Sequence, residues 1–151
     1  MKLNLVVLTA LTVGSVTAPA VQAQTPPENY VGVGIRAGFN DPTAFVIDSK
    51  VKLTDLADAA TLSVRPAVLF DDGAELRLPI SVDFGVSERF YPYAGAGVAY
   101  NADGSSRIDP LITGGIDVSI TRNLVLDLNL NMLFKPDDTD TEFTATINYV
   151  F

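Results

Sequence analysis

The sequence ends in TEFTATINYVF, residues 141–151, and its last nine residues alternate between an apolar set and a mostly polar set. A period of two is typical of a β-strand with two different faces. Chain ends usually fray, yet three of the five side chains in the apolar set are aromatic, and one of them is the terminal Phe151. The stretch therefore predicts a strand whose apolar face is covered up to the end of the chain.

The same alternation recurs along the chain, and each stretch is closed by turn-forming residues. The short connections make neighbouring strands antiparallel, which gives an up-and-down meander. Residues 53–62, LTDLADAATL, are the one segment where a helical turn is an alternative. We predict eight strands, at 30–39, 44–54, 61–70, 73–84, 90–100, 107–120, 123–134 and 142–151.

The aromatic residues on the apolar face lie near the strand ends, whereas the middle of that face is aliphatic. Following the chain up and down places Phe39, Phe45, Phe70, Tyr100, Phe134 and Phe143 at one rim, and Phe84, Phe90, Tyr149 and Phe151 at the other. A soluble core has no physical reason for this sorting, but aromatic girdles mark the two interfaces of a membrane. We therefore predict an all-β fold, an eight-stranded antiparallel up-and-down transmembrane β-barrel with its apolar face in lipid.

The opposite face of the strands carries charges of both signs, which would line the lumen. Eight strands enclose a space only wide enough for side chains or one small ligand. A nearly balanced set of charges favours ion pairs that fill the barrel over a selective pore lined by one sign. The predicted lumen charge network is Arg36, Asp48, Lys50, Arg65, Glu75, Arg77, Asp83, Asp117 and Asp127.

Residues 1–23 have the layout of a cleavable secretory signal peptide, with Lys2, an apolar run at 5–16, and small residues before a cut after Ala23. The run is too short for a spanning helix. Residues 24–151 then form one β-barrel domain. The chain has no Cys, which excludes disulfides and lipid attachment at a cysteine. Its formal net charge of -8 makes it a poor binder of nucleic acid.

Three stretches resemble the small eight-stranded outer-membrane β-barrel proteins of diderm bacteria, the OmpA/OmpX-like barrels. They are the C-terminal TEFTATINYVF, FYPYAGAGVAYN at 90–101, and ITRNLVLDLNL at 120–130. The resemblance implies an outer-membrane location, with outer-membrane lipid and the barrel-assembly machinery as partners. It also implies that this machinery reads a C-terminal assembly signal, carried here by Phe143, Ile147, Tyr149 and Phe151.

The interpretation favoured by these patterns is a closed barrel with a structural or envelope-maintenance role, expected to be a monomer. A narrow porin-like channel for small solutes is the first alternative, and it needs a continuous water path past Tyr91, Tyr93, Arg36 and Arg65. The second is a soluble periplasmic barrel that binds an apolar ligand and has its faces reversed. The chain has no His, which removes the usual general base, so neither catalysis nor a cofactor is expected.

Two features leave alternatives open. Acidic outer loops could hold a divalent cation through oxygen ligands, or their aspartates are simply turn formers; the candidates are Asp71, Asp72, Asp137, Asp138 and Asp140. Prolines inside predicted strands each remove a ladder donor, so a bulge or strand end is expected at each one. These prolines are Pro66, Pro79, Pro92 and Pro110.

Overall fold

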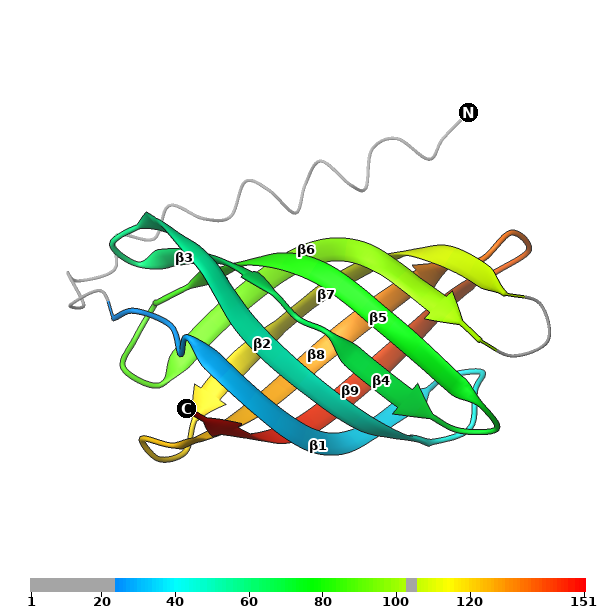
Figure 1. The fold of residues 1–151 in the computed structure, drawn as a ribbon, viewed down its shortest axis with the longest axis horizontal. Helices are drawn as coiled ribbons and strands as arrows, with labels where there is room; N and C mark the ends of the chain where they lie inside the picture. Colours follow the sequence, from blue (N-terminus) through cyan, green and yellow to red (C-terminus); the bar gives the residue numbers. More distant parts are fainter. Residues whose placement is uncertain (1–23, 103–105) are drawn as a thin grey trace.

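The computed structural model describes residues 24–102 and 106–151, which form a single β-barrel (Figure 1). The predicted signal peptide, residues 1–23, lies outside the described residues. No helix in the described parts of the chain is long and apolar enough to cross a membrane. The strands are β1 Asn29–Gly38, β2 Ala44–Ala57, β3 Ala60–Val64, β4 Ala67–Phe70, β5 Ala74–Phe84, β6 Phe90–Asn101, β7 Arg107–Ser119, β8 Leu124–Phe134 and β9 Thr139–Val150.

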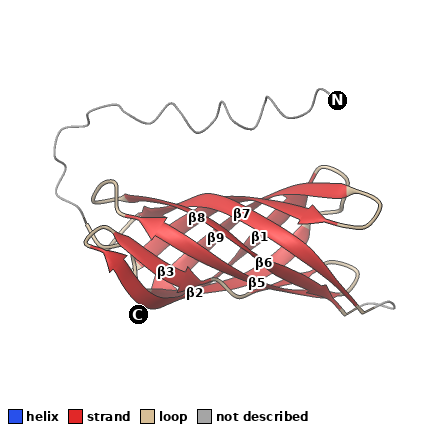
Figure 2. Ribbon diagram, turned by 90° about the horizontal axis from the view of Figure 1, so that it is seen from above, coloured by secondary structure: helices blue, strands red, loops and turns tan. Residues whose placement is uncertain are grey.

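The strands close into a ring (Figure 2). β3 and β4 follow each other beside the same two neighbours, β2 and β5, so the nine strands occupy eight places. The last strand, β9, pairs antiparallel with β1, with Tyr30 opposite Val150 and Gly38 opposite Glu142. The predicted eight-stranded up-and-down barrel is confirmed, and the terminal strand completes it.

The alternative of a helical turn at 53–62 is wrong. β2 continues in extended form to Ala57, and a tight turn at 58–59 leads into β3. The pairing of β2 with β3 shifts register twice, between Lys52 and Thr54 and between Asp55 and Ala57. Such bulges take up extra residues and keep the chain extended, which explains why the strict alternation is lost there.

Only one of the four prolines interrupts its strand. Pro66 separates β3 from β4, as expected, whereas Pro79, Pro92 and Pro110 lie inside unbroken strands, so the prediction was wrong for these three. In an antiparallel ladder, the N–H and C=O of a residue point to the same neighbour. Pro79 lies opposite the interruption between β3 and β4, where its carbonyl accepts a hydrogen bond from Arg65 N at 2.9 Å.

The other two prolines lie where a ladder ends. On the β5 side of β6, pairing stops at Tyr93, one residue after Pro92. On the β8 side of β7, it starts at Leu111, one residue after Pro110. Ser119 N donates to the carbonyl of Arg89, and this alternation directs both prolines away from the β6–β7 ladder. Each missing donor therefore faces a position without a ladder partner.

The apolar face of the sheet lies on the outside of the barrel. Mid-strand side chains such as Ile35, Leu78 and Ile112 are about half exposed, at 57%, 48% and 50%. All ten aromatic residues assigned to the two rims are exposed as well. A soluble barrel that binds an apolar ligand would have the opposite arrangement, so that alternative is wrong.

Candidate functional site: the side-chain network of the lumen

Arg65 lies at the centre of the lumen, in the gap between β3 and β4, and its side chain is buried. Its Nη2 atom lies 2.7 Å from Asp83 Oδ1 and 2.9 Å from Asp117 Oδ2. Its Nε donates to Ser81 Oγ at 2.9 Å, and Nη1 donates to Tyr30 Oη at 2.6 Å. Each nitrogen of the guanidinium therefore has a partner, and the planar group, whose donors have fixed directions, is held in one orientation.

Lys50 completes this central cluster from β2. Its Nζ is fully buried and lies 3.3 Å from Asp83 Oδ2 and 3.4 Å from Asp117 Oδ2. Asp83 Oδ2 also accepts hydrogen bonds from Thr61, at 3.2 Å, and from Ser63. Two cations thus face two carboxylates, and this pairing offsets the desolvation of all four charges.

Tyr93 connects the central cluster to the β7–β8 wall. Its ring centroid lies 3.4 Å from Arg65 Cζ, a cation–π contact, and its hydroxyl donates to Asp127 Oδ1 at 2.7 Å. Gly115 lies opposite Tyr93 in the ladder. A Cβ at Gly115 would lie 2.5 Å from the backbone oxygen of Leu128 and 2.8 Å from Tyr93 Cζ, so a side chain here would crowd both the neighbouring strand and the Tyr93 ring.

A second cluster lies toward the rim opposite the chain ends. Glu142 bridges two arginines, with Oε1 2.8 Å from Arg36 Nη1 and Oε2 2.6 Å from Arg77 Nη2. Arg36 Nη2 also lies 2.7 Å from Asp71 Oδ2. Arg77 Nε donates to Glu75 Oε1 at 2.5 Å. The cluster links strands β1, β5 and β9 across the interior.

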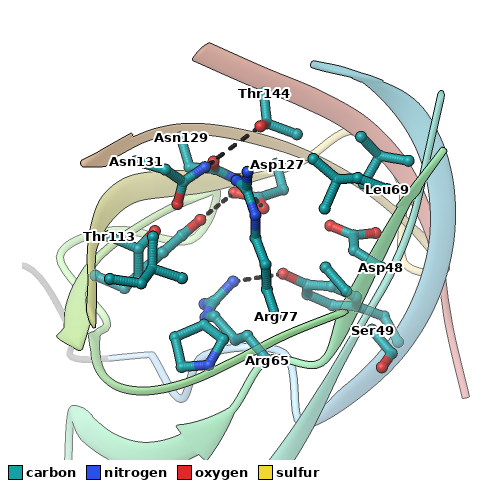
Figure 3. A pocket seen from close by; sticks show the side chains of 16 residues that line it. Asp48, Ser49, Arg65, Leu69, Arg77, Thr113, Asp127, Asn129, Asn131 and Thr144 are labelled. Atoms are coloured by element: carbon teal, nitrogen blue, oxygen red, sulfur yellow. Dashed lines mark hydrogen bonds between the residues drawn. The ribbon is translucent and has the colours of Figure 1, made fainter. Parts of the chain in front are cut away.

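Asp48 stands apart from the ion pairs, although it lies in the lumen as predicted. Its Oδ2 accepts from Thr146 Oγ1 at 2.8 Å, and its Oδ1 has no hydrogen-bond partner among the described residues. It lines a cavity of about 40 Å³. Figure 3 shows Asp48 and Leu69 on one side of this cavity, and Thr113 and Asn131 on the other. One water needs about 10–15 Å³, so the cavity has room for only a few.

Apolar side chains fill the lumen alongside the charged clusters. One buried group comes from β2 and β4, and a second comes from β6, β7 and β8. Apolar side chains exclude water from the space that they occupy, so they narrow the route around the ion pairs. The two groups are Ala44, Val46 and Leu69, and Ala99, Leu111 and Leu133.

The residues just before β1 lie close to a turn at the end of the barrel that carries both described chain ends (Figure 1). Pro26 is buried. The backbone oxygen of Gln24 lies so close to Gly85 that a Cβ there would be only 1.6 Å away. The first described residues therefore pack against the turn between β5 and β6.

The acidic loop residues do not come together as a cation site. Within 24–102 and 106–151, no three Asp or Glu side chains are grouped so that they could hold a metal ion. Asp71 pairs with Arg36, and Asp140 is buried and pairs with Lys135. Burial lowers the pKa of Lys135, but its hydrogen bond with Asp140 raises that pKa above its ordinary value. The other three candidates, Asp72, Asp137 and Asp138, are exposed.

The four residues of the expected assembly signal all lie on the outer surface of the closing strand or directly after it. Phe143, Ile147 and Tyr149 are exposed on β9 at 42%, 54% and 56%. Phe151 is exposed at 72%, and its backbone N donates to the carbonyl of Asn29 at 3.2 Å. The terminal residue is therefore tied to β1 through its backbone, while its ring points outward.

Sequence reasoning left Glu142, Asp140 and Tyr30 out of the lumen network and named Tyr93 only as an obstacle to a water path. It also missed the hydroxyl groups that join the network, those of Thr61, Ser63, Ser81 and Thr146. Glu142 and Asp140 are inward-facing by simple extension of the alternation in TEFTATINYVF, so that pattern contained the signal. Tyr30 and Tyr93 are also inward by alternation. Their contacts with Arg65, however, join β1 and β6 to the break between β3 and β4, strands far apart in the sequence. No local pattern indicates such a contact.

No family model and no curated protein matches the chain, but solved structures share its fold. A de novo designed transmembrane β-barrel has a TM-score of 0.65 and 20% identity, covering 85% of this chain and 99% of its own. The N-terminal β-barrel domain of Pseudomonas aeruginosa OprF has a TM-score of 0.59 and 14% identity, with coverages of 85% and 100%. Ail, the attachment invasion locus protein of Yersinia pestis, has a TM-score of 0.57 and 12% identity, covering 82% of this chain and 96% of its own.

These similarities establish the fold of a small transmembrane β-barrel. They confirm the resemblance to small outer-membrane barrels as a resemblance of fold, since all the identities are low.

Proposed function

We propose that the chain is an integral outer-membrane protein whose closed lumen serves a structural, envelope-maintenance role. Residues 1–23 would be removed as a signal peptide, and residues 24–151 would form the mature barrel. Both chain ends of the barrel lie at the same rim, because the number of strands in the ring is even, and in this proposal that rim faces the periplasm. The aliphatic outer band between two aromatic rims supports placement in a bilayer.

The main support for the proposal that the lumen is closed is the cluster of ion pairs around Arg65. Arg65, Lys50, Asp83 and Asp117 meet inside the ring and pair with one another, so their side chains fill interior space at that height, and eight strands enclose little more than side chains. The cavity beside them is too small for a solute path. This arrangement favours the structural role over the narrow channel.

In this proposal, outer-membrane lipid surrounds the barrel, and the barrel-assembly machinery recognises the C-terminal residues before folding. A monomer is expected, since the ring closes within one chain.

The test is made in the bacterium that encodes the chain. The protein is expected in the outer-membrane fraction, resistant to extraction by carbonate and released only by detergent. A deletion strain should admit more of a large hydrophobic dye or antibiotic, and wild-type protein should restore the barrier. Recovery in the soluble periplasmic fraction would contradict the location, and an unchanged barrier in the deletion strain would contradict the role.

A further inference from the structure

Two arginines stand out because every other basic residue in the described segments is paired. The chain has ten Lys and Arg, and only Lys2 lies outside those segments, which leaves nine. Seven of the nine lie within ion-pair distance of a carboxylate, namely Arg36, Lys50, Lys52, Arg65, Arg77, Arg107 and Lys135. Arg89 and Arg122 form no ion pair within 24–102 and 106–151. In a chain with 18 acidic residues, two cations without partners need an explanation.

The two arginines lie in neighbouring turns and line the same depression, which has a volume of about 540 Å³. Arg89 directly precedes β6, and Arg122 lies in the turn after β7. The turns adjoin, because Ser119 N donates to the carbonyl of Arg89 at 2.8 Å. Glu88 and Thr121 also line the depression. Both turns belong to the rim that carries the chain ends.

The conformation of these turns does not depend on the guanidinium groups. Ser87 Oγ accepts from the backbone N of Arg89 and of Phe90, at 3.3 and 3.1 Å. Tyr91 Oη donates to the carbonyl of Glu88 at 2.9 Å, and Thr121 Oγ1 accepts from Leu124 N at 3.1 Å. The two arginine side chains are exposed and remain available for a ligand.

The depression lies at the rim between the mouth of the lumen and the apolar outer surface: the buried Tyr91 lines it from the inner face, and the exposed Ile120 lines it from the outer one. Phe90 follows Arg89 directly and is 47% exposed, and Ile120 lies two residues before Arg122 and is 51% exposed. Aromatic girdle residues mark the level of the lipid headgroups. Arginines next to such residues therefore lie at the level of lipid phosphates, with apolar surface for acyl chains alongside.

We propose that Arg89 and Arg122 form a binding site for the phosphate of an anionic phospholipid in the periplasmic leaflet, a site that rests on the proposed membrane orientation. Guanidinium groups bind phosphate oxygens bidentately. The charged side chains that line the depression, two arginines and Glu88, sum to a formal charge of one positive unit, which one phosphodiester neutralises. The hydroxyls of Ser119 and Thr121, which line it too, suit a hydroxylated headgroup such as that of phosphatidylglycerol. The acyl chains would lie against Phe90 and Ile120.

The test measures binding of phosphatidylglycerol and of phosphatidylcholine to the folded chain in zwitterionic detergent, by native mass spectrometry. Wild-type protein should bind phosphatidylglycerol more tightly. Each arginine near a lipid surface contributes about a fivefold effect, so R89Q/R122Q should weaken phosphatidylglycerol binding about thirtyfold. The matched control is R107Q, which removes an arginine from the opposite rim and should leave the affinity unchanged.

Two results would overturn the proposal: equal affinity of wild type and R89Q/R122Q for phosphatidylglycerol, or an equal loss in R107Q. Titration with inorganic phosphate tests whether the ligand is a lipid phosphate or a free anion. If inorganic phosphate bound as tightly as phosphatidylglycerol, the depression would be a site for a soluble anion instead. Insertion into vesicles is scored separately, by heat-modifiable electrophoretic mobility. Wild-type protein that inserts but does not select phosphatidylglycerol therefore contradicts the lipid site and not the membrane location.

Discussion

Replacing Arg65 by Met tests the central cluster most sharply. Methionine fills part of the same volume but removes the charge and all the donors. Asp83 and Asp117 would lose their contacts with the guanidinium at 2.7 and 2.9 Å, and Lys50, at 3.3 and 3.4 Å, would be the one cation left beside them. The four-charge cluster, neutral in the wild type, would then carry one uncompensated negative charge. Tyr30 and Ser81 would each lose a hydrogen-bond partner as well.

The expected loss in the free energy of unfolding is about 3–5 kcal/mol, the usual cost of removing one partner from a buried ion pair. The control is Arg107→Met, which breaks a pair with Asp109 in which the arginine side chain is 42% exposed. That loss should be only about 0–1 kcal/mol. The double variant R65M/D117N should recover part of the loss, because it also removes the unpaired carboxylate.

The assay is reversible urea unfolding of the barrel in phosphatidylcholine vesicles. Circular dichroism is the suitable signal, because the chain has no Trp. The reasoning would be refuted if Arg65→Met were no more destabilising than Arg107→Met. It would also be refuted if D117N added its full cost to that of R65M, because independent costs would mean that the two residues do not interact.

Three further variants test other parts of the structure. Gly115→Ala should destabilise the barrel by about 1–3 kcal/mol in the same assay, because its Cβ would overlap the backbone oxygen of Leu128 and the Tyr93 ring. Gly114→Ala, whose Cβ would lie 3.8 Å from its nearest neighbour, is the control, and equal losses would contradict this packing. Ile112→Arg should cost about 2–4 kcal/mol in vesicles, and an unchanged stability would argue against a lipid-facing position. Phe151→Ser should slow the appearance of folded protein in cells while the stability of the folded barrel changes little, and an unchanged assembly rate would contradict a role for this residue in assembly.

The strands and their faces could be predicted because both depend on local alternation. Alternation assigns each side chain to the lipid face, as for Ile112, or to the lumen face. The pairing of β1 with β9 follows because eight strands in a row can close into a ring. The aromatic rims then decide which face is outside. None of these inferences needs the three-dimensional position of one strand relative to a distant one.

The partners inside the lumen could not be predicted in the same way. Alternation shows that Arg65 and Asp117 point inward, but the stagger of the strands decides which side chains reach the same height. The prediction of a bulge or strand end at each proline was wrong for a related reason. The cost of a proline depends on whether its missing N–H faces a paired neighbour, and Pro92 and Pro110 face ladder ends that only the register reveals.

The central claim is that the ion pairs around Arg65 close the lumen, and conductance across a planar lipid bilayer tests it most directly. If the paired side chains close the lumen, purified wild-type barrel should insert without producing steady unitary currents. Steady and reproducible openings of the wild-type protein would contradict the claim and favour the narrow channel.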